Sequence, residues 1–265
     1  MFDAHAHLQD PRFKGTLASV LKRALEAQVT GICCCATAPA DWQAVKLVEA
    51  EHSSAQLVII PAYGVHPWYV EDLYSDWLEL LEYYLELNPV APLGEIGLDG
   101  IRKSVSRELQ RSVLTIQLEM AARLQRPVIL HGARAWGELA DIVKPFAGRL
   151  PAIIVHGFSG SAEIMNRFVE MGAYLSIAGS VCNPHAFKVR GAAVQIPDGQ
   201  LLIETDAPDL FPEGGTPAAM DEKNRPLNQP SNLKLICDEV ADLRHVTSDE
   251  IADITASNAR MAFLG

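Results

Sequence analysis

The sequence lacks any long uninterrupted hydrophobic run. No apolar stretch in its 265 residues approaches the ~20 residues that a membrane-spanning helix needs, so no membrane association is expected. The start has no cationic segment followed by an apolar one, because Asp3, His5 and His7 interrupt it, and no secretory signal is expected. Linkers, internal repeats and low-complexity segments are also missing. These absences favour a cytoplasmic protein with a single domain over residues 1–265 and no obligate protein partner.

Basic residues are in the minority. Lysine and arginine together number 22 against 33 aspartates and glutamates, which gives a net charge of -11. An acidic surface repels nucleic acid at long range, so broad coating of a duplex by a basic face is excluded. Contact with nucleic acid would have to be local, through metal ions or through a few lysines and arginines at one rim.

Cysteine is also scarce. Three of the five cysteines are adjacent, at Cys33, Cys34 and Cys35, within an apolar segment. Three neighbouring thiols cannot all pair with one another or converge on one ion. We therefore expect buried thiols in a reducing compartment.

Strand-like and helix-like patterns alternate along the chain. Eight short apolar runs, each bounded by glycine, proline or polar residues, lie at 2–6, 31–36, 57–64, 91–96, 127–131, 152–156, 173–177 and 201–205. Helical periodicity is clearest at 16–28, 76–87 and 106–125, and shorter stretches lie at 136–146, 161–172 and 185–195. A loop rich in proline, glycine and asparagine then runs to Gln229, and two helical stretches follow it. Eight alternating units predict an α/β fold, a closed (β/α)8 TIM barrel.

Polar residues gather where the predicted strands end, which is where a barrel of this kind builds its active site. His5 and His7 lie two apart at the end of the first strand, so their side chains project from one face. A single histidine at a strand end is more often a core residue than a ligand, and an exposed N-terminus with chance histidines is the alternative for this pair. The coincidence of four histidines and two carboxylates favours a site, made of His5, His7, Glu95, His131, His156 and Asp206.

These residue types indicate a metal centre. Neutral imidazoles and carboxylates suit divalent ions such as Zn²⁺, Mn²⁺ or Mg²⁺, and four histidines with two acids are enough for two ions that share a bridging carboxylate. Two such ions and two carboxylates leave an excess of positive charge, which favours an anionic group such as phosphate. A pair of ions lowers the pKa of a bridging water and stabilises the attacking and leaving oxygens, so hydrolysis is the predicted reaction class.

Three further polar residues lie close to these positions. His66 follows the third strand, where it either contacts substrate or caps a turn. Asp99 either hydrogen-bonds a ligating histidine or caps the following loop. Glu204 precedes Asp206 by two residues and points the same way, one layer deeper, where a carboxylate needs hydrogen bonds. We expect Glu204 to support a metal ligand from behind.

The sequence contains, in this order, the motifs DAHAHL, GVHPW, GEIGLDG, PVILHGA, VHGFSGS and ETDAPDL. Their order and spacing resemble the TatD family of metal-dependent hydrolases, a branch of the amidohydrolase-like barrels, and the resemblance covers nearly the whole chain. It implies a deoxyribonuclease that depends on divalent metal and trims single strands from the 3' end. Its substrate partner would be the ends of DNA, in single-stranded form.

The resemblance also implies roles for individual residues. Asp206 and Glu95 are the implied catalytic residues: Asp206 orients the attacking water, and Glu95 bridges the two ions. His66 would lie near the substrate phosphate. The ligands other than Glu95 would divide between the two ions. His5, His7 and Asp206 would hold one ion, and His131 and His156 would hold the other.

The chain departs from the family pattern beside two of these motifs. Gly100 stands where many members have an aromatic residue, and the fifth-strand histidine is followed by Gly132 and Ala133 rather than Ser-Arg. Arg134, one place later, and Lys188 are the candidate phosphate contacts. These departures concern the substrate rather than the metal chemistry.

Three functions are compatible with the sequence. The first is a metal-dependent phosphodiesterase that acts on DNA ends, with bases held at the mouth of the site by side chains such as Trp68 and Trp136, each of which has core packing as its alternative. The second is a hydrolase of a small amide, ester or lactone, or of an aminoacyl ester on tRNA. The third is a catalytically silent barrel retained for binding.

Overall fold

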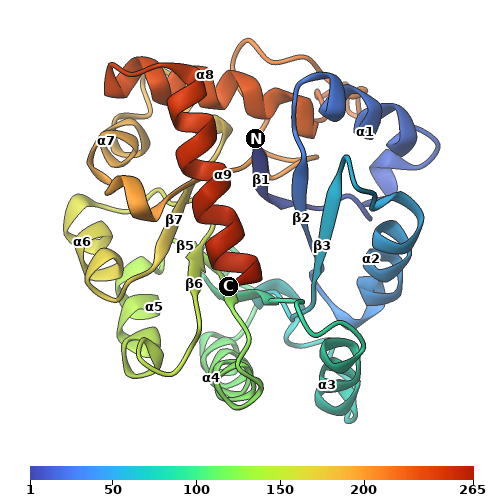
Figure 1. Cartoon of the computed structure of the whole chain (residues 1–265). Coiled ribbons are helices and arrows are strands. Elements are labelled where there is room, and N and C mark those ends of the chain that lie inside the picture. The colour runs from blue at the N-terminus through green and yellow to red at the C-terminus, as the bar shows by residue number, and fades with distance from the viewer.

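The computed structural model describes residues 1–265 and contains a ring of eight parallel strands surrounded by helices (Figure 1). The strands are β1 Phe2–Ala6, β2 Gly31–Cys35, β3 Val58–Ala62, β4 Leu93–Asp99, β5 Val128–Ala133, β6 Ile153–Val155, β7 Tyr174–Ile177 and β8 Leu201–Ile203. The helices are α1 Leu17–Glu26, α2 Pro39–His52, α3 Trp77–Leu87, α4 Arg107–Leu124, α5 Trp136–Val143, α6 Ala162–Glu170, α7 Phe187–Gln195, α8 Leu233–Arg244 and α9 Ser248–Leu264. None of them is both long and apolar enough to cross a membrane.

Two short junctions close the ring. Strands β1 to β3 form one sheet and β4 to β8 form another. Isolated parallel bridges join Tyr63 to Leu93 and Ala6 to Ala207, so the two sheets meet at both of their edges. The predicted (β/α)8 barrel is confirmed, and all eight predicted strands are present.

The core has two layers, because the strands are apolar on both faces. One large cluster fills the space between the strands and the outer helices. A smaller cluster lies inside the barrel, where Cys33 and Cys35 point inward and Phe263 of α9 stacks on Phe2, with 5.6 Å between ring centroids. The five cysteines are free thiols, and all except Cys182 are buried.

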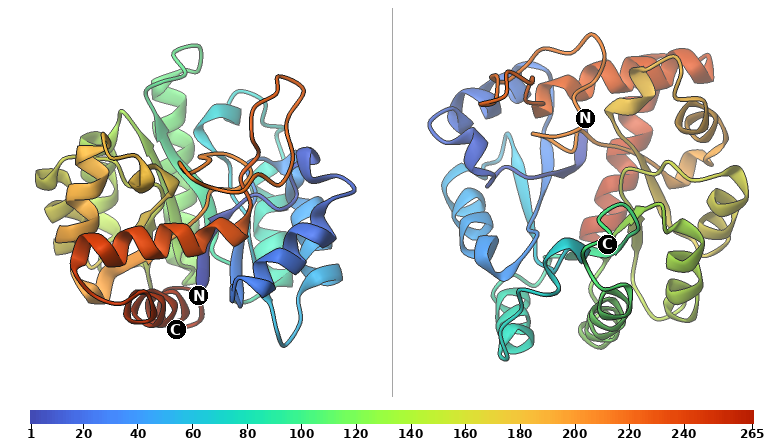
Figure 2. Two further views of the ribbon diagram at one scale, coloured as in Figure 1. Left: turned by 90° about the horizontal axis from the view of Figure 1, so that it is seen from above. Right: turned by 180° about the vertical axis from the view of Figure 1, so that it is seen from behind.

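The two ends of the barrel differ. Helix α9 and both termini lie at the end where the strands begin (Figure 2). At the opposite end, the loops after β4 and β8 project beyond the strands (Figure 2, left). The carboxyl ends of the strands are therefore left open by the fold, as the site requires.

Strand β4 passes very close to β5 at Gly97. A Cβ atom at this position would lie 2.0 Å from the backbone oxygen of His131, a fixed atom that cannot move without shifting β5. We expect Gly97→Ala to lower the free energy of unfolding by at least about 3 kcal/mol. The control is Gly137→Ala in α5, where the nearest atom is 3.7 Å away and alanine should be neutral or stabilising. Denaturant unfolding of both variants tests this, and equal stabilities would contradict the close approach.

Candidate metal centre

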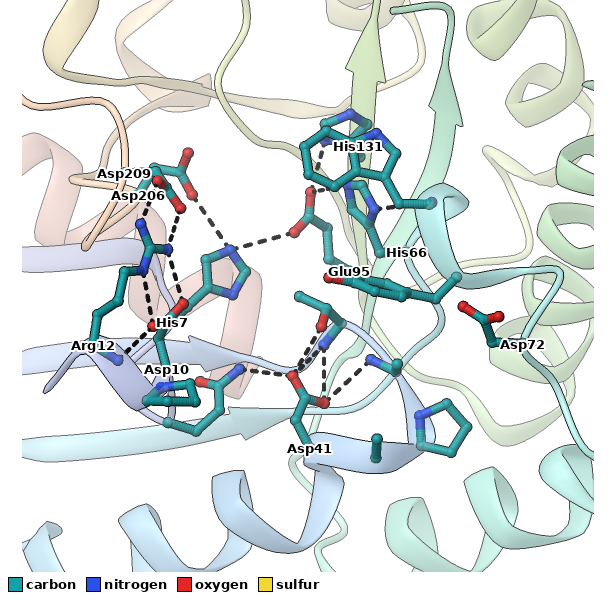
Figure 3. Close-up of a pocket in the computed structure, with 18 of the residues that line it drawn as sticks. His7, Asp10, Arg12, Asp41, His66, Asp72, Glu95, His131, Asp206 and Asp209 are labelled. Carbon is teal, nitrogen blue, oxygen red and sulfur yellow. Dashed lines mark hydrogen bonds and ion pairs between the residues drawn. The ribbon is translucent and has the colours of Figure 1, made fainter. Parts of the chain in front are cut away.

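The six candidate ligands predicted from the sequence lie together at the open end of the barrel. They come from five strands: β1 and the residue just after it, β4, β5, and the residues that follow β6 and β8. Figure 3 shows His7, His131 and Asp206 around the carboxylate of Glu95. The end of β1 and the segment after β8 are held together by two backbone bonds across the barrel junction, from His7 N–H to the Ala207 oxygen and from Asp206 N–H to the His5 oxygen.

Glu95 stands at the centre of the cluster, and its two oxygens face different histidines. Its Oε2 lies 3.3 Å from His5 Nε2 and 3.6 Å from His7 Nε2. Its Oε1 lies 2.8 Å from both His131 Nδ1 and His156 Nε2. The carboxylate therefore separates the imidazoles into two pairs, with one oxygen for each pair.

Asp206 completes the first of these pairs. Its Oδ1 lies 3.4 Å from His7 Nε2 and 3.6 Å from His5 Nε2. His5, His7 and Asp206 form one group of potential ligand atoms that lie close enough together to hold a single ion.

Acceptors behind three of the rings set which nitrogen carries the proton. The outward nitrogen of each ring is paired, His7 Nδ1 with the Cys35 oxygen at 2.7 Å, His131 Nε2 with Asp99 Oδ2 at 3.1 Å, and His156 Nδ1 with Glu204 Oε1 at 3.2 Å. A neutral ring that donates through its outward nitrogen presents a lone pair through the inward one.

The inward atoms fit a divalent cation. His131 Nδ1 and His156 Nε2 are 3.2 Å apart, and both lie against the same oxygen of Glu95. Atoms at such distances need a positive charge among them. That charge is a proton, since the adjacent carboxylates outweigh burial and raise the pKa of both histidines, or a metal ion that replaces the proton. Imidazole nitrogen and carboxylate oxygen are the donors that Zn²⁺ and Mn²⁺ accept, and the residues present therefore fit a metal ion.

The cluster keeps its carboxylates ionised. Burial raises the pKa of Glu95, but the surrounding histidines outweigh it and hold this pKa well below its ordinary value. The pKa of Asp206 is lowered in the same way. Burial raises this pKa, but the hydrogen bond with His7 and the charges of the nearby histidines outweigh burial. Both acids are thus available as anionic ligands at neutral pH.

His66 differs from His7, His131 and His156 because its proton faces the site. Its Nδ1 accepts the backbone N–H of Trp68 at 3.1 Å, which places the ring proton on Nε2, 3.6 Å from Glu95 Oε1. Burial lowers the pKa of His66 to about 3, so the ring is neutral. The structure confirms that His66 caps the turn at Pro67–Tyr69; the ring also lines the cavity, and its contact with substrate stays a prediction.

Asp99 also combines its two expected roles. Its Oδ2 pairs with His131, while its Oδ1 accepts the backbone N–H groups of Ile101 and Arg102 at 2.6 and 2.8 Å. One carboxylate therefore orients a candidate ligand and fixes the loop after β4. Glu204 is completely buried behind His156, where it also accepts the backbone N–H of Gly157 at 2.7 Å.

The cluster opens into a cavity of about 620 Å³ whose rim is acidic. Several polar residues at this rim were not identified from the sequence. They are Gln9, Asp10, Arg12, Asp41, Asp72 and Asp209. Arg12 lies between two acids, donating to Asp10 at 2.8 Å and to Asp209 at 2.7 Å (Figure 3). Asp209 follows Asp206 by three residues, so proximity to a predicted ligand was the available signal.

The other predicted substrate contacts are divided. Trp68 lines the cavity and is 38% exposed, with the guanidinium of Arg102 over its ring. Trp136 instead packs against Phe158 and Phe168 and does not line the cavity, so core packing describes it. Arg134 and Lys188 are exposed and also lie outside the cavity lining, and their phosphate contacts stay predictions.

A parallel barrel with imidazoles and carboxylates gathered at the carboxyl ends of its strands has the architecture of the metal-dependent hydrolases. The chain belongs to the family described as TatD related DNase, whose sequence model matches residues 2–264. It is a metal-dependent hydrolase of this family.

Individual relatives match over nearly their whole length. The chain is 33% identical to the 3'-5' ssDNA/RNA exonuclease TatD of Pantoea ananatis, over 99% of both chains. It is 35% identical to the uncharacterized metal-dependent hydrolase YjjV of Escherichia coli, over 98% of this chain and 96% of the relative. The crystal structure of YjjV superposes with a TM-score of 0.89 at 33% identity and covers 100% of this chain and 98% of that one.

Proposed function

We propose that the protein is a two-metal phosphodiesterase that removes nucleotides from the 3' end of single-stranded DNA, with single-stranded RNA as a related substrate. The observation that carries this proposal is Glu95, whose two oxygens face two separate pairs of histidines. The relative from Pantoea ananatis, named a 3'-5' ssDNA/RNA exonuclease, supports the substrate class. We extend the proposal to one hydrolase domain over residues 1–265 and, because the cysteines are free thiols, to a reducing, cytoplasmic location.

The ligands divide between two divalent ions, which we take to be Mg²⁺, Mn²⁺ or Zn²⁺. His5, His7 and Asp206 would hold one ion, His131 and His156 would hold the other, and Glu95 would serve both. When bound, such a pair lowers the pKa of an attacking water and offsets the charge of the phosphate. Asp99 and Glu204 fix the rings of His131 and His156 from behind.

The chain's own residues then move protons and hold the substrate. Asp206, ionised and at the edge of the cluster, accepts the proton of the attacking water. Neutral His66 donates a hydrogen bond from its Nε2–H to a phosphate oxygen and keeps its proton. Trp68 provides an exposed ring on which a terminal base stacks.

The charge of the cavity predicts action at strand ends. Its lining contains six carboxylates and a single arginine, which is already bound by two of them. A strand threaded through the cavity would bring its phosphates against these acids, whereas a terminal nucleotide brings one phosphate to the metal centre. We expect linear single strands to be degraded and closed circular ones of the same sequence to resist cleavage in the same assay.

Metal-loaded protein, a labelled linear strand and its ligated circle test this expectation. Equal rates on both forms would contradict end-directed action. The same preparation should be assayed on a panel of small esters, amides and lactones and on aminoacyl-tRNA, because a 620 Å³ cavity also suits a small molecule. Rapid hydrolysis in that panel, with no nuclease activity, would replace the proposed function by the alternative one.

A further inference from the structure

The loop after β4 carries a charge opposite to that of the rest of the active-site mouth. The loops after β1, β3 and β8 and the first turn of α2 contribute aspartates to the cavity, and the one guanidinium among them, Arg12, is neutralised. Residues 100–106, in contrast, contain Arg102 and Lys103 and no acid. In Figure 2 (left) this loop projects beyond the barrel at the end where the site opens.

Both of these cations are free to bind an anion. Their side chains are exposed, and no carboxylate lies within ion-pair distance of either. Of the neighbouring charges, Arg107 pairs with Glu138 and Asp99 pairs with His131, whereas Glu71 accepts the backbone N–H of Ser106 at 3.0 Å and forms no ion pair. In a chain with a net charge of -11, two unpaired cations on one projecting loop form a local anion-attracting surface.

Trp68 connects this loop with the metal centre. Its ring lies 5.0 Å from the ring of His66 on the side of the site, and the guanidinium of Arg102 lies 5.6 Å from its centroid. A second hollow of about 560 Å³ is lined by Arg102, Lys103, Ser104 and Ser106, together with the carboxylates of Glu71 and Asp99. The order from the site outward is therefore a hydrogen-bond donor, an aromatic ring, and then two cations.

We propose that single-stranded nucleic acid leaves the active site over Trp68 and along residues 100–106, with a base stacked on Trp68 and backbone phosphates against Arg102 and Lys103. This inference rests on the proposed nuclease function and adds the path of the strand. Stacking on an aromatic ring tolerates any base, and unpaired cations follow a phosphate backbone without reading sequence. The aspartates after β1, β3 and β8 disfavour a path of the strand over those loops.

The test is binding, measured apart from cleavage. Metal-loaded protein is titrated into a fluorescent ten-nucleotide single strand with cleavage-resistant phosphorothioate linkages, and anisotropy is followed across a range of salt concentrations. For Arg102→Ala/Lys103→Ala we expect Kd to rise by at least about tenfold at low salt and the slope of log Kd against log salt to fall by about one per removed cation. For Trp68→Ala we expect weaker binding with an unchanged salt slope, because an uncharged contact is lost.

Matched controls remove the same residue types at other exposed positions. Arg260→Ala in α9 and Lys144→Ala after α5 lower the net charge equally but lie away from the loop, and both should bind as the unmodified protein does. Equal losses in the control pair and the loop pair, or no binding by the unmodified protein, would overturn the proposed path. Tight, loop-dependent binding without cleavage of an ordinary strand would instead leave the path intact and contradict the nuclease function.

Discussion

Glu95→Ala should abolish binding of both metal ions, the largest effect expected of any single ligand substitution. One residue faces both histidine pairs, with 2.8 Å from its Oε1 to His131 and 3.3 Å from its Oε2 to His5. Removing a group that only supports a ligand already costs about 10–100-fold in metal affinity, and loss of a shared ligand should cost more for each ion. The measurement is the metal content of the purified protein by elemental analysis, with up to two ions per chain expected before substitution.

The control for this variant is Glu51→Ala, at the end of α2, where the carboxylate is exposed and far from the site. It should keep the metal content and hydrolytic rate of the unmodified protein. If Glu95→Ala retained both ions at unchanged affinity, the bridging assignment would be wrong. If the unmodified protein held no metal and took up none on reconstitution, the two-metal proposal would fail as a whole.

Much of the fold could be predicted because its strands are apolar on both faces. The apolar run at 127–131 is too short for an amphipathic helix, so the existence of β5 follows from composition, although the strand itself spans Val128–Ala133. Helix α2 was not expected from periodicity, because alanines and charged residues surround its few buried side chains, among them Trp42 and Val45. Its existence depends on packing against the barrel rather than on an apolar stripe.

The candidate ligands could be located for a related reason. Parallel strands end at the same side of a barrel, so polar residues at the end of apolar runs must converge, whatever the distances between them in the sequence. His5 and Asp206 are 201 positions apart and yet lie at the same barrel junction, where the backbone of one bonds to the other.

Other parts of the site have no signal in the sequence. The acceptor that orients His7 is the backbone oxygen of Cys35, which any residue would supply. The pairing of Arg12 with Asp209 depends on how two loops fold toward each other. The position of Trp136, soon after a predicted strand, is equally compatible with the mouth of the site and with the core. Its ring packs beside Phe158 because the glycine at position 132 leaves room for it.

Asp206→Asn should separate metal binding from catalysis. The residue has φ +54°, a backbone conformation that asparagine also tolerates, and its backbone N–H stays bonded to His5 whichever side chain is present. Its carboxylate makes no hydrogen bond to the loop after β8, since the turn there is closed by the backbone oxygen of Asp206 and the N–H of Asp209. The fold should therefore survive the substitution.

The expected result is retained metal with a large loss of turnover. His5, His7 and Glu95 still surround the same ion in Asp206→Asn, but an amide cannot accept the proton of the attacking water as a carboxylate does. General-base catalysis of this kind contributes about 10²–10⁴-fold in rate, so turnover should fall by at least the lower figure. Metal content, melting temperature and hydrolysis are measured on one preparation, beside Asp253→Asn on the outside of α9 as the matched control. A lower melting temperature with unchanged activity per folded molecule would assign Asp206 a structural role, whereas a folded, metal-loaded and fully active variant would remove it from the mechanism.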